Sequence, residues 1–441
     1  MISMPENVKY IISQLEKSGY EAYAVGGCIR DSLMGLTPHD WDVTTSALPQ
    51  QVLSSLDAHN IIDSGMKHGT VTVKLGQDLY EITTFRADGE YTDCRRPDSV
   101  SFVTSLTEDL ARRDFTMNAI AYNDKAGVCD PFSGEQDLKN RLIRCVGDPD
   151  KRFGEDALRI LRALRFASRL GFEIEEKTSL SLHKNAYLLD NISAERKCSE
   201  LLQIIDGEYA EKVLIDYSDV LSVVIPEISP MIGFEQHNPH HIYDVWQHTV
   251  KVIVNSPHGK VSRLSAMFHD IGKPHCFSLD EDGVGHFKPH PGISADMSRE
   301  IMNRLRLDKK TITEVSNLIL YHDTRPPATD KNIRRMIHNV GAENFIALLE
   351  LKKADTLAQN PETIDYKLEY IEQLRKIFAE QTKNGEQFSL KTLNINGSDL
   401  ISIGITDGKT IGKTLNTLLS LVIDGELEND HDLLLNAAKN I

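Results

Sequence analysis

The stretch GGCIRDSLMGLTPHDWD, residues 26–42, decides the fold that we expect for the N-terminal part of the chain. It ends in Asp40 and Asp42, which are one residue apart. Alternate side chains of a strand lie on one face, so both carboxylates would point toward the same place. Two convergent carboxylates repel each other unless a cation lies between them, and Mg²⁺ is a usual cation for such oxygen ligands. The pair therefore predicts a magnesium site on a strand.

Two glycines, Gly26 and Gly27, open the same stretch and are followed by Arg30. Glycine has no side chain, so the backbone N–H groups of such a turn can approach a ligand closely, and an arginine adds a fork of donors. A turn that binds phosphate beside a pair that binds metal is what nucleotidyl transfer requires. The alternative is a glycine turn before a solvated acidic strand end, which the glycines alone would favour.

The composition, with 26% charged and 40% hydrophobic residues, is that of a folded globular protein. A chain of 441 residues exceeds one ordinary core, so we expect several domains. No apolar run approaches the roughly 20 residues of a membrane span, and residues 1–20 have the pattern of a surface helix. Six cysteines without a CxxC pair favour reduced thiols and a cytoplasmic location. The net charge of −16 is unfavourable for nucleic acid, but residues 139–169 hold nine Lys/Arg against four acids.

A third carboxylate, Glu81, lies in the strand-like run LYEITTF, residues 79–85, which follows a similar run over 69–75. An acidic residue in a largely apolar strand is costly unless it is paired or liganded. A neighbouring strand can place it beside Asp40 and Asp42. Three carboxylates would hold two ions, which lower the pKa of an attacking 3′-hydroxyl and stabilise leaving pyrophosphate. The alternative is an edge-strand glutamate that faces water.

The segment RRDFTMNA, residues 112–119, supplies groups that suit a nucleotide. Arg113 suits triphosphate oxygens, and Asp114 and Asn118 suit ribose hydroxyls. Alone, the segment is also compatible with a capped, salt-bridged helix start.

A helix is predicted over FGEDALRILRALRFASRL, residues 153–170, with Asp156 and Arg159 as neighbours three residues apart. Such a pair offers an acceptor and a donor, which complement cytosine and adenine but not uracil or guanine. Arg162 and Arg165 continue along the helix and can reach phosphates or RNA. The alternative, and the commoner meaning of such a pair, is a salt bridge on a solvated face.

With these motifs in order, residues 20–205 resemble the class II tRNA nucleotidyltransferases, which comprise the CCA-adding enzymes and their bacterial poly(A) polymerase relatives. The resemblance is carried by GGCIRDSLMGLTPHDWD, EITTFR, DGEYTDCRRPDSVSF, RRDFTMNAIAY, DPFSGEQDLKNRLIR and FGEDALRILRALRFA. It implies that Asp40 and Asp42 are catalytic, metal-binding carboxylates, with Glu81 as the third.

The same resemblance implies that Gly27, Arg30 and Arg113 bind the incoming triphosphate, and that Asp156 with Arg159 selects CTP and ATP. The segment 193–202, SAERKCSELL, resembles the family's next helix motif. The full set that we expect at the nucleotide is Gly26, Gly27, Arg30, Arg113, Asp114, Asn118, Asp156, Arg159, Arg162 and Arg165.

Within the family, the loop over 86–101 is full length, whereas CC-adding enzymes lack it. The basic signature of poly(A) polymerases near the second strand is absent from IIDSGMKHGTVTVKL. CCA addition is therefore favoured, although an enzyme that adds only A would look nearly the same.

A second set of ligand-type residues consists of His248, His269, Asp270 and Asp355. Imidazoles and carboxylates suit first-row metals, and an adjacent His-Asp lets two ligands reach one ion from a helix. Surface histidines in a helical domain are the alternative for any one of them. The ordered set resembles the H…HD…D signature of HD-superfamily phosphohydrolases.

That second resemblance implies a site for Mn, Ni, Co or Fe that hydrolyses phosphoesters or cyclic nucleotides. His290 and His322 are expected to complete a second metal position. His286 and Asp323 are nearby in the sequence and of the same residue types.

The fold that these resemblances imply is α+β: a polymerase-beta-like nucleotidyltransferase head with a small mixed sheet, then all-helical neck, body, HD and tail domains. The segment 398–429, with Gly404, Gly408 and Gly412, resembles the part with which family members grip the tRNA elbow; a glycine-punctuated turn before a helix is the alternative. The expected boundaries are 1–145 for the head, 146–235 for neck and body, 236–375 for the HD domain and 376–441 for the tRNA-binding tail.

The expected function is addition of C, C and A to tRNA 3′ ends from CTP and ATP, with Mg²⁺ and without a nucleic-acid template, by a monomer or homodimer. Two alternatives stay open. One is an A-adding enzyme or poly(A) polymerase, and the other is an HD phosphohydrolase whose first half only binds RNA.

Overall fold

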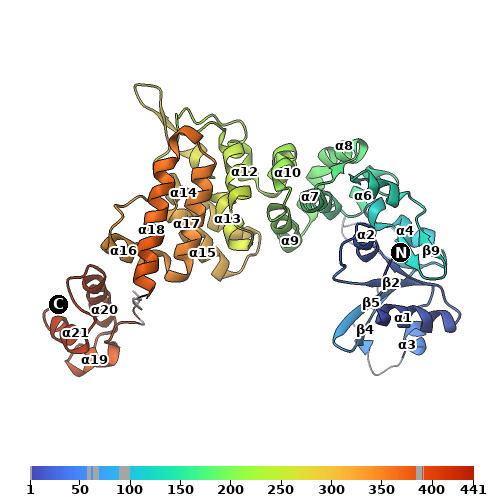
Figure 1. Cartoon of the computed structure of the whole chain (residues 1–441), viewed down its shortest axis with the longest axis horizontal. Helices are drawn as coiled ribbons and strands as arrows, with labels where there is room; N and C mark the ends of the chain where they lie inside the picture. Colours follow the sequence, from blue (N-terminus) through green and yellow to red (C-terminus); the bar gives the residue numbers. More distant parts are fainter. Residues whose placement is uncertain (1, 57–60, 63–68, 89–99, 384–389, 391) are drawn as a thin grey trace. The chain divides into compact units, whose positions relative to one another are not determined.

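The computed structural model describes residues 2–56, 61–62, 69–88, 100–383, 390 and 392–441 (Figure 1). By its internal contacts the chain divides into two units, Met1–Pro226 and Glu227–Ile441. The finer division into four domains stays a prediction, and residues 89–99 of the expected loop lie outside the described residues. Within the described ranges, no helix is both long enough and apolar enough to cross a membrane.

Unit 1 contains a mixed sheet in which seven described strands follow the order β3-β4-β5-β2-β1-β8-β9. The strand β2 runs parallel to β5 and antiparallel to β1. The runs predicted at 69–75 and 79–85 are confirmed as β4 and β5, and β5 is an interior strand rather than an edge strand. The strands are β1 Ala22–Val25, β2 Asp42–Thr45, β3 Ile61–Ile62, β4 Thr70–Leu75, β5 Asp78–Thr84, β8 Ala121–Asn123 and β9 Gly127–Cys129. A separate ladder pairs β6 Arg86–Asp88 with β7 Val100–Phe102.

Burial alternates along the strand β5, so one face of the sheet packs on the core and the other is exposed. Tyr80, Ile82 and Thr84 are buried, whereas Leu79 and Glu81 are exposed. This alternation is typical of a half-buried strand, and it leaves the face with Glu81 free.

The described helices of unit 1 surround the sheet and continue beyond it. The helix α7 packs on α9, and α6 packs on α8. Their bounds are α1 Glu6–Lys17, α2 Gly27–Leu33, α3 Pro49–Ser55, α4 Leu106–Ala111, α5 Gly134–Lys139, α6 Pro149–Glu155, α7 Leu158–Leu170, α8 Glu176–Asn185, α9 Ala194–Ile205, α10 Ala210–Asp216 and α11 Ser218–Val224.

The single helix predicted over 153–170 is wrong, because α6 ends at Glu155 and α7 begins at Leu158. Asp156 has extended backbone angles of φ −138° and ψ 100°, and its carboxylate accepts a hydrogen bond from the N–H of Leu158 at 3.1 Å. Aspartate competes for backbone donors in this way and so favours helix ends over helix interiors.

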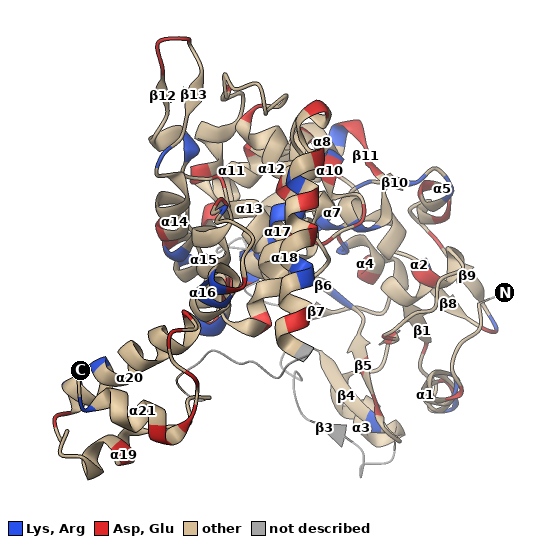
Figure 2. Cartoon of the chain, turned by 60° about the vertical axis from the view of Figure 1, so that its left-hand side comes forward, with Lys and Arg blue, Asp and Glu red and all other residues tan. Residues whose placement is uncertain are grey.

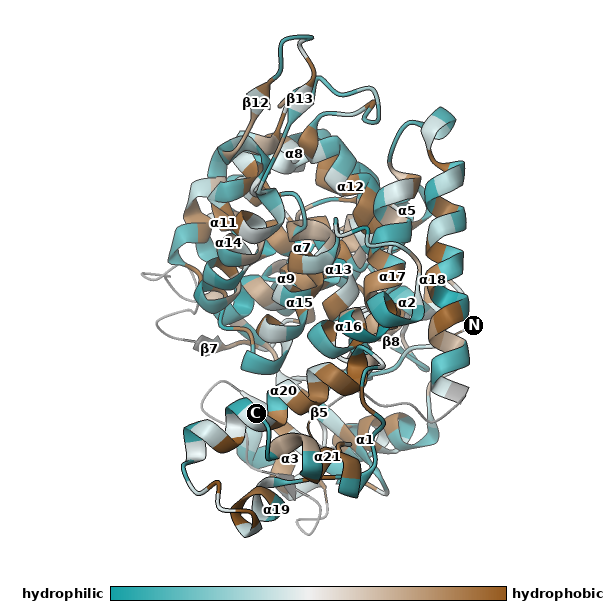
Figure 3. Ribbon diagram, turned by 90° about the vertical axis from the view of Figure 1, so that its left-hand side faces the viewer, coloured by the Kyte–Doolittle hydropathy of each residue, from teal (hydrophilic) through white to brown (hydrophobic). Residues whose placement is uncertain are grey.

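Unit 2 is mostly helical, and its helices carry charges of both signs and alternate polar with apolar faces (Figures 2 and 3). The helix α14 packs on α15, α12 packs on α17, and α17 packs on α18. The bounds are α12 Val245–Asn255, α13 Lys260–Phe268, α14 His290–Arg304, α15 Lys309–Tyr321, α16 Asp330–Val340, α17 Ala342–Leu357, α18 Asp365–Lys383, α19 Gly397–Ser402, α20 Gly408–Ile423 and α21 His431–Ala438.

The parts predicted as all-helical are not entirely so. A parallel ladder joins β10 Leu142–Ile143 to β11 Glu173–Ile174, and a hairpin joins β12 Ser278–Leu279 to β13 Gly285–His286. In the C-terminal segment Gly404 has a φ of +96°, whereas Gly408 and Gly412 lie within α20. The helices α19 to α21 enclose a small core of their own, which includes Leu400, Leu418 and Leu434.

Candidate active sites

The expected nucleotide-binding residues of unit 1 line one open hollow with a volume of about 650 Å³. They come from the turn before α2, the start of β2, a 3₁₀ turn over Thr116–Asn118 and the helix α7. The expected residues in the lining are Gly26, Gly27, Arg30, Asp40, Asp42, Arg113, Asp114, Asn118, Asp156, Arg159, Arg162 and Arg165. Glu81 is the one expected residue of this site outside the lining.

The carboxylates of Asp40, Asp42 and Glu81 gather where two neighbouring strands meet the hollow. The strand β2 begins at Asp42, and Asp40 precedes it. Because β2 and β5 run parallel with Val43 opposite Ile82, the preceding residues, Asp42 and Glu81, lie level on the same face. All three acidic residues are exposed.

The pKa of Asp42 shows how these charges interact. The surrounding protein removes part of the hydration of this carboxylate and raises its pKa, and Glu81 and Asp40 raise it further, while Arg113 opposes the shift. A divalent cation would relieve this repulsion, and exposed carboxylate oxygens are the ligands that Mg²⁺ takes together with substrate phosphates. The donor set therefore fits Mg²⁺.

The turn at Gly26 makes room for Arg113. Gly26 has a φ of +83°, a conformation that side chains disfavour, and a Cβ built there would lie 3.0 Å from Nη1 of Arg113. Burial lowers the pKa of Arg113, and Asp109, 3.6 Å from its Nη2, opposes that shift. The bare backbone and the guanidinium thus form one wall for an anionic ligand.

A chain of hydrogen bonds links the glycine turn to α7. Arg30 donates to Oδ1 of Asn118 at 2.8 Å, and Asn118 donates to Oδ1 of Asp114 at 3.0 Å. Nε of Arg162 donates to Oδ2 of Asp114 at 2.8 Å. Burial would raise the pKa of Asp114, but Arg162 and these donors hold it well below its usual range. The chain holds two arginines at fixed positions on the wall.

Asp156 and Arg159 do not pair with each other. Arg196 of α9 donates to Oδ2 of Asp156 at 3.0 Å, and the buried Arg159 donates to Glu155 at 2.9 Å. The reason is the helix break at Asp156, which removes the three-residue helical spacing on which the prediction depended. Both side chains still line the hollow.

The ring of Phe166 contacts the guanidinium groups of three of the expected arginines. The ring centroid lies 5.1 Å from Cζ of Arg30, 5.5 Å from Cζ of Arg162 and 4.7 Å from Cζ of Arg165. Guanidinium groups within about 6 Å of an aromatic centroid are attracted by its quadrupole. The aromatic ring therefore helps to hold the positive wall of the hollow.

The sequence prediction missed several residues of this lining. Arg169 follows Arg165 by four residues on α7, so helical spacing could have found it. Arg196 and Gln203 come from α9, and only the packing of α9 on α7 brings them to the hollow. Asp109 is fully buried and lies outside the lining, but it binds Arg112, which does line the hollow, at 2.8 Å; an acid three residues before an arginine is the local signal for this pair.

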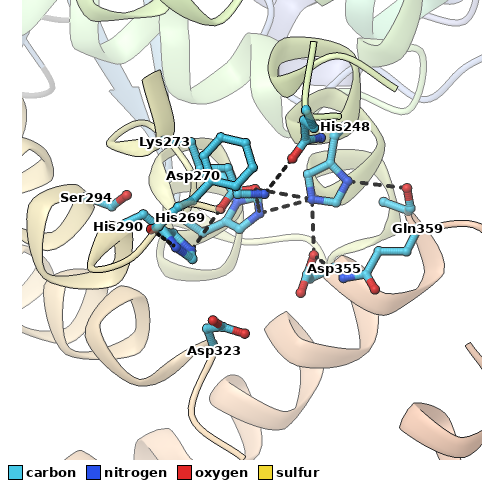
Figure 4. A network of polar contacts seen from close by, with 12 residues as sticks. His248, His269, Asp270, Lys273, His290, Ser294, Asp323, Asp355 and Gln359 are labelled. Carbon is cyan, nitrogen blue, oxygen red and sulfur yellow. Dashed lines mark hydrogen bonds and ion pairs between the residues drawn. The ribbon is translucent and has the colours of Figure 1, made fainter. Parts of the chain in front are cut away.

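In unit 2, four histidines and two aspartates form a cluster in which Asp355 is half-buried and the other five are buried; Figure 4 labels three of the histidines and both aspartates. Its members are His248, His269, Asp270, His290, His322 and Asp355. Two overlapping groups within it could hold a metal ion: His248, His269 and Asp270, and Asp270, His290 and His322. All four predicted signature residues are thus brought together, and His290 and His322 join them through Asp270.

Asp270 lies at the centre of the cluster. Its Oδ2 is 3.1 Å from Nε2 of His269 and 3.4 Å from Nε2 of His248, and its Oδ1 is 3.3 Å from Nε2 of His290. Oδ1 of Asp355 is 3.1 Å from Nε2 of His248. His269 and Lys273 counter the effect of burial and hold the pKa of Asp270 well below its usual range, so it is ionised.

The backbone sets the tautomers of all four histidines. Each Nδ1 faces a carbonyl oxygen, and because a carbonyl only accepts, each Nδ1 carries the hydrogen. The distances are 3.3 Å from His248 to Ala358, 2.8 Å from His269 to Ala266, 3.0 Å from His290 to Phe287 and 2.6 Å from His322 to Ile319.

The Nε2 atoms of the four histidines face one another in two pairs. Nε2 of His248 lies 3.4 Å from Nε2 of His269, and Nε2 of His290 lies 3.3 Å from Nε2 of His322. Burial and the neighbouring His269 and His290 lower the pKa of His322 to about 3, so it is neutral. Asp270 opposes the effect of burial on His269 and raises its pKa. Imidazoles and ionised carboxylates with this convergence fit divalent transition metals.

Two nearby residues of ligand type lie outside this cluster. His286 is exposed and contacts Asp280 at 2.7 Å, and Asp323 is exposed and contacts Arg325 at 3.3 Å. In Figure 4 no contact joins Asp323 to the cluster. The sequence alone could not separate these two from the ligand-type residues that converge.

Comparison with known proteins agrees with the architecture of both units. Residues 22–144 match the family "Poly A polymerase head domain", residues 171–232 match "Probable RNA and SrmB- binding site of polymerase A", and residues 290–438 match "tRNA nucleotidyltransferase domain 2 putative". These matches define the class of the chain as a nucleotidyltransferase with a polymerase head.

Whole-chain relatives define the class more narrowly. The CCA-adding enzyme of Limosilactobacillus fermentum is 33% identical, with 98% of this chain and 96% of the relative covered. The CCA-adding enzyme of Geobacillus stearothermophilus is 34% identical, with 96% of this chain and 93% of the relative covered. A crystal structure of the Bacillus stearothermophilus CCA-adding enzyme in complex with CTP is 29% identical in sequence, with a TM-score of 0.75. The match covers 99% of this chain and 98% of that structure's chain. The chain belongs to the class II family of CCA-adding enzymes and poly(A) polymerases.

Proposed function

We propose that this protein adds C, C and A to the 3′ end of tRNA from CTP and ATP without a nucleic-acid template. The observation that supports this most is the single hollow that joins exposed carboxylates to a wall of arginines and to Asp156. The relatives named above support CCA addition over an A-adding enzyme or poly(A) polymerase.

Asp40 and Asp42, with Glu81 beside them, would hold Mg²⁺. When bound, the metal activates the tRNA 3′-hydroxyl and stabilises the leaving pyrophosphate. Arg30 and Arg113 bind the triphosphate, with Gly26 and Gly27 allowing close approach.

The remaining expected residues position the nucleoside. Asp114 and Asn118 orient the ribose, and Arg162 holds Asp114 by its short contact. Asp156 and Arg159 select the base, and Arg196 orients the Asp156 carboxylate. Arg165 and its neighbours on α7 face the RNA.

The test is purified protein with tRNA that lacks its 3′ end and with each labelled nucleotide offered separately. We expect CTP and ATP to be incorporated in order, with addition stopping after three. Long tracts made from ATP alone would assign the protein as a poly(A) polymerase, and a single A on tRNA that already ends in CC, without any C addition, would assign it as an A-adding enzyme.

For unit 2 we propose a metal-dependent phosphohydrolase of the HD superfamily. The observation that favours it is the convergence of the Nε2 atoms of four histidines on Asp270. The residues that would hold Mn, Ni, Co or Fe are His248, His269, Asp270 and Asp355, with His290 and His322 at a second position. Bound divalent ions supply an activated water at neutral pH.

The cluster opens to a cavity of about 200 Å³ whose cations suit a phosphate group. Lys273, 2.7 Å from Oδ2 of Asp270, Arg325 and Lys367 are among the residues that line it. The test is release of phosphate from phosphoesters by metal-stripped protein to which each ion is returned in turn. Absence of hydrolysis with every ion would contradict the proposal.

A further inference from the structure

A second cavity, of about 360 Å³, adjoins the metal-type cluster of unit 2. It lies between α17, α18 and the loop over 325–328. Among the residues that line it, the apolar and aromatic ones are Pro326, Pro327, Ala328, Tyr366, Tyr370 and Ile371. Cavities of this size with apolar walls and a few polar groups are typical of small-molecule sites.

This cavity adjoins the one over the cluster. Four residues line both of them: His322, Arg325, Asp355 and Lys367. Two of the four belong to the cluster and two carry positive charge. A ligand can therefore contact the cluster with one end and the apolar walls with the other.

The aromatic wall comes from one face of α18. Tyr366 and Tyr370 are four residues apart, so their rings lie on the same side of the helix. The hydroxyl of Tyr370 donates to the carbonyl oxygen of Pro326 at 2.6 Å, which ties the opposite wall to α18. Tyr366 is 58% exposed although it is large and aromatic, and it lines the cavity with Nζ of Lys367 5.7 Å from its ring centroid.

The cation between the two cavities is tied to a cluster residue. Lys367 donates to Oε1 of Gln359 at 2.5 Å, and Gln359 donates to Oδ1 of Asp355 at 3.0 Å. Lys367 is 6% exposed, so its ammonium has a defined place at the junction. A positive group at this point suits a phosphate that lies against the cluster.

We propose that the cavity between α17, α18 and the loop over 325–328 is a subsite for the base of a nucleoside phosphate whose phosphate lies at the cluster. This inference rests on the proposed phosphohydrolase function. The base would stack on Tyr366 and Tyr370, and Lys367 and Arg325 would neutralise the phosphate. A phosphoester without a ring would leave the subsite empty and would bind less well.

The experiment compares two substrates in the full-length protein: adenosine 3′-phosphate and glycerol phosphate. Tyr366→Ala should lower kcat/KM for the nucleotide by about tenfold, since the base loses the aromatic ring on which it stacks. It should leave glycerol phosphate unchanged. Tyr366→Phe, which retains the ring, should behave as wild type, and Tyr187→Ala, an exposed tyrosine of unit 1, is the matched control.

A second readout does not depend on hydrolysis. In metal-free protein, saturation-transfer NMR should show contact between the base protons and the protein, and this signal should decrease in Tyr366→Ala but not in Tyr187→Ala. The transferase hollow is unchanged in both variants, so its contribution cancels.

The two readouts separate the two hypotheses. If neither substrate is hydrolysed, the phosphohydrolase proposal fails, and the subsite is then judged by the NMR signal alone. If Tyr366→Ala retains both the preference for the nucleotide and the base signal, the subsite proposal is overturned.

Discussion

The two candidate metal sites of this chain place their charged side chains in opposite environments, one exposed and one buried. In unit 1 Asp40 and Asp42 are exposed in the lining of an open hollow, and the exposed Glu81 lies beside Asp42. In unit 2 the cluster around Asp270 is buried, with His248 and His269 fully enclosed. An open carboxylate site suits a metal that retains water and shares its substrate's phosphates, whereas a closed imidazole site suits a metal held by the protein itself.

The largest effect that we expect is on the open site. Asp42→Ala should lower nucleotide incorporation into tRNA by at least about a hundredfold, because it removes the ligand that lies level with Glu81. The measurement is single-turnover incorporation of labelled CTP. Asp78→Ala, an exposed aspartate at the start of β5, is the control and should retain activity. Full incorporation of CTP by the Asp42→Ala protein would contradict the proposed metal site in unit 1.

The closed site should respond to its metal through stability as well as activity. Mn²⁺ or Ni²⁺ at a hundred times its Kd should stabilise unit 2 by about 2.7 kcal/mol, measured as a rise in the melting temperature. Asp270→Ala should abolish both that rise and any hydrolysis, because Asp270 contacts three of the histidines.

The Asp270→Ala variant also tests whether the two sites are independent. Asp270→Ala should leave nucleotide incorporation within about twofold of wild type, because Asp270 belongs to unit 2 and the residues that line the hollow belong to unit 1. Asp296→Ala, an exposed aspartate of α14, is the control. Joint loss of both activities would show that the sites are coupled.

A smaller effect is expected from the ring that holds the arginine wall. Phe166→Leu should raise the KM for CTP and ATP by about tenfold with a smaller change in kcat, because three guanidinium groups lose their aromatic partner. Phe166→Tyr retains the ring and should restore the wild-type KM. An unchanged KM in the Leu variant would show that the hydrogen bonds to Asp114 suffice to position the wall.

The smallest effect concerns the stability of the open site without metal. The pKa of Asp42 is raised on folding, so its ionised form destabilises the fold at neutral pH. Asp42→Asn should therefore raise the free energy of unfolding by less than about 0.5 kcal/mol. The gain should be present at neutral pH and should disappear as the pH falls toward 4 and the native carboxylate is protonated. Urea titrations with a chelator present would measure it, and a loss of stability in Asp42→Asn would contradict the repulsion among the carboxylates.

The sequence was sufficient where function depends on spacing within one element. The strands β4 and β5 and the arginine face of α7 have periodic patterns, and His269 and Asp270 are adjacent in the sequence. His248 and Asp355 lie on the separate helices α12 and α17, and a family resemblance rather than a local pattern grouped them with this pair.

The sequence could not supply partners that come from separate elements. Arg196 of α9 binds Asp156, and no local pattern indicates that contact. The role of Asp156 and Arg159 in selecting the base stays a prediction. The helix break at Asp156 was missed because its apolar period continues across the break.

The hydrogen bonds from the four histidine Nδ1 atoms of the unit 2 cluster affect which substitutions this site can tolerate in evolution. Main-chain carbonyls of Ala266, Phe287, Ile319 and Ala358 orient the imidazoles, so the side chains at those positions are not needed for it. Many metal sites depend on outer carboxylates that must be retained along with the ligands. Here the outer shell is drawn from the peptide backbone, so the side chains behind the histidines are free to diverge as long as the helix ends keep their shape.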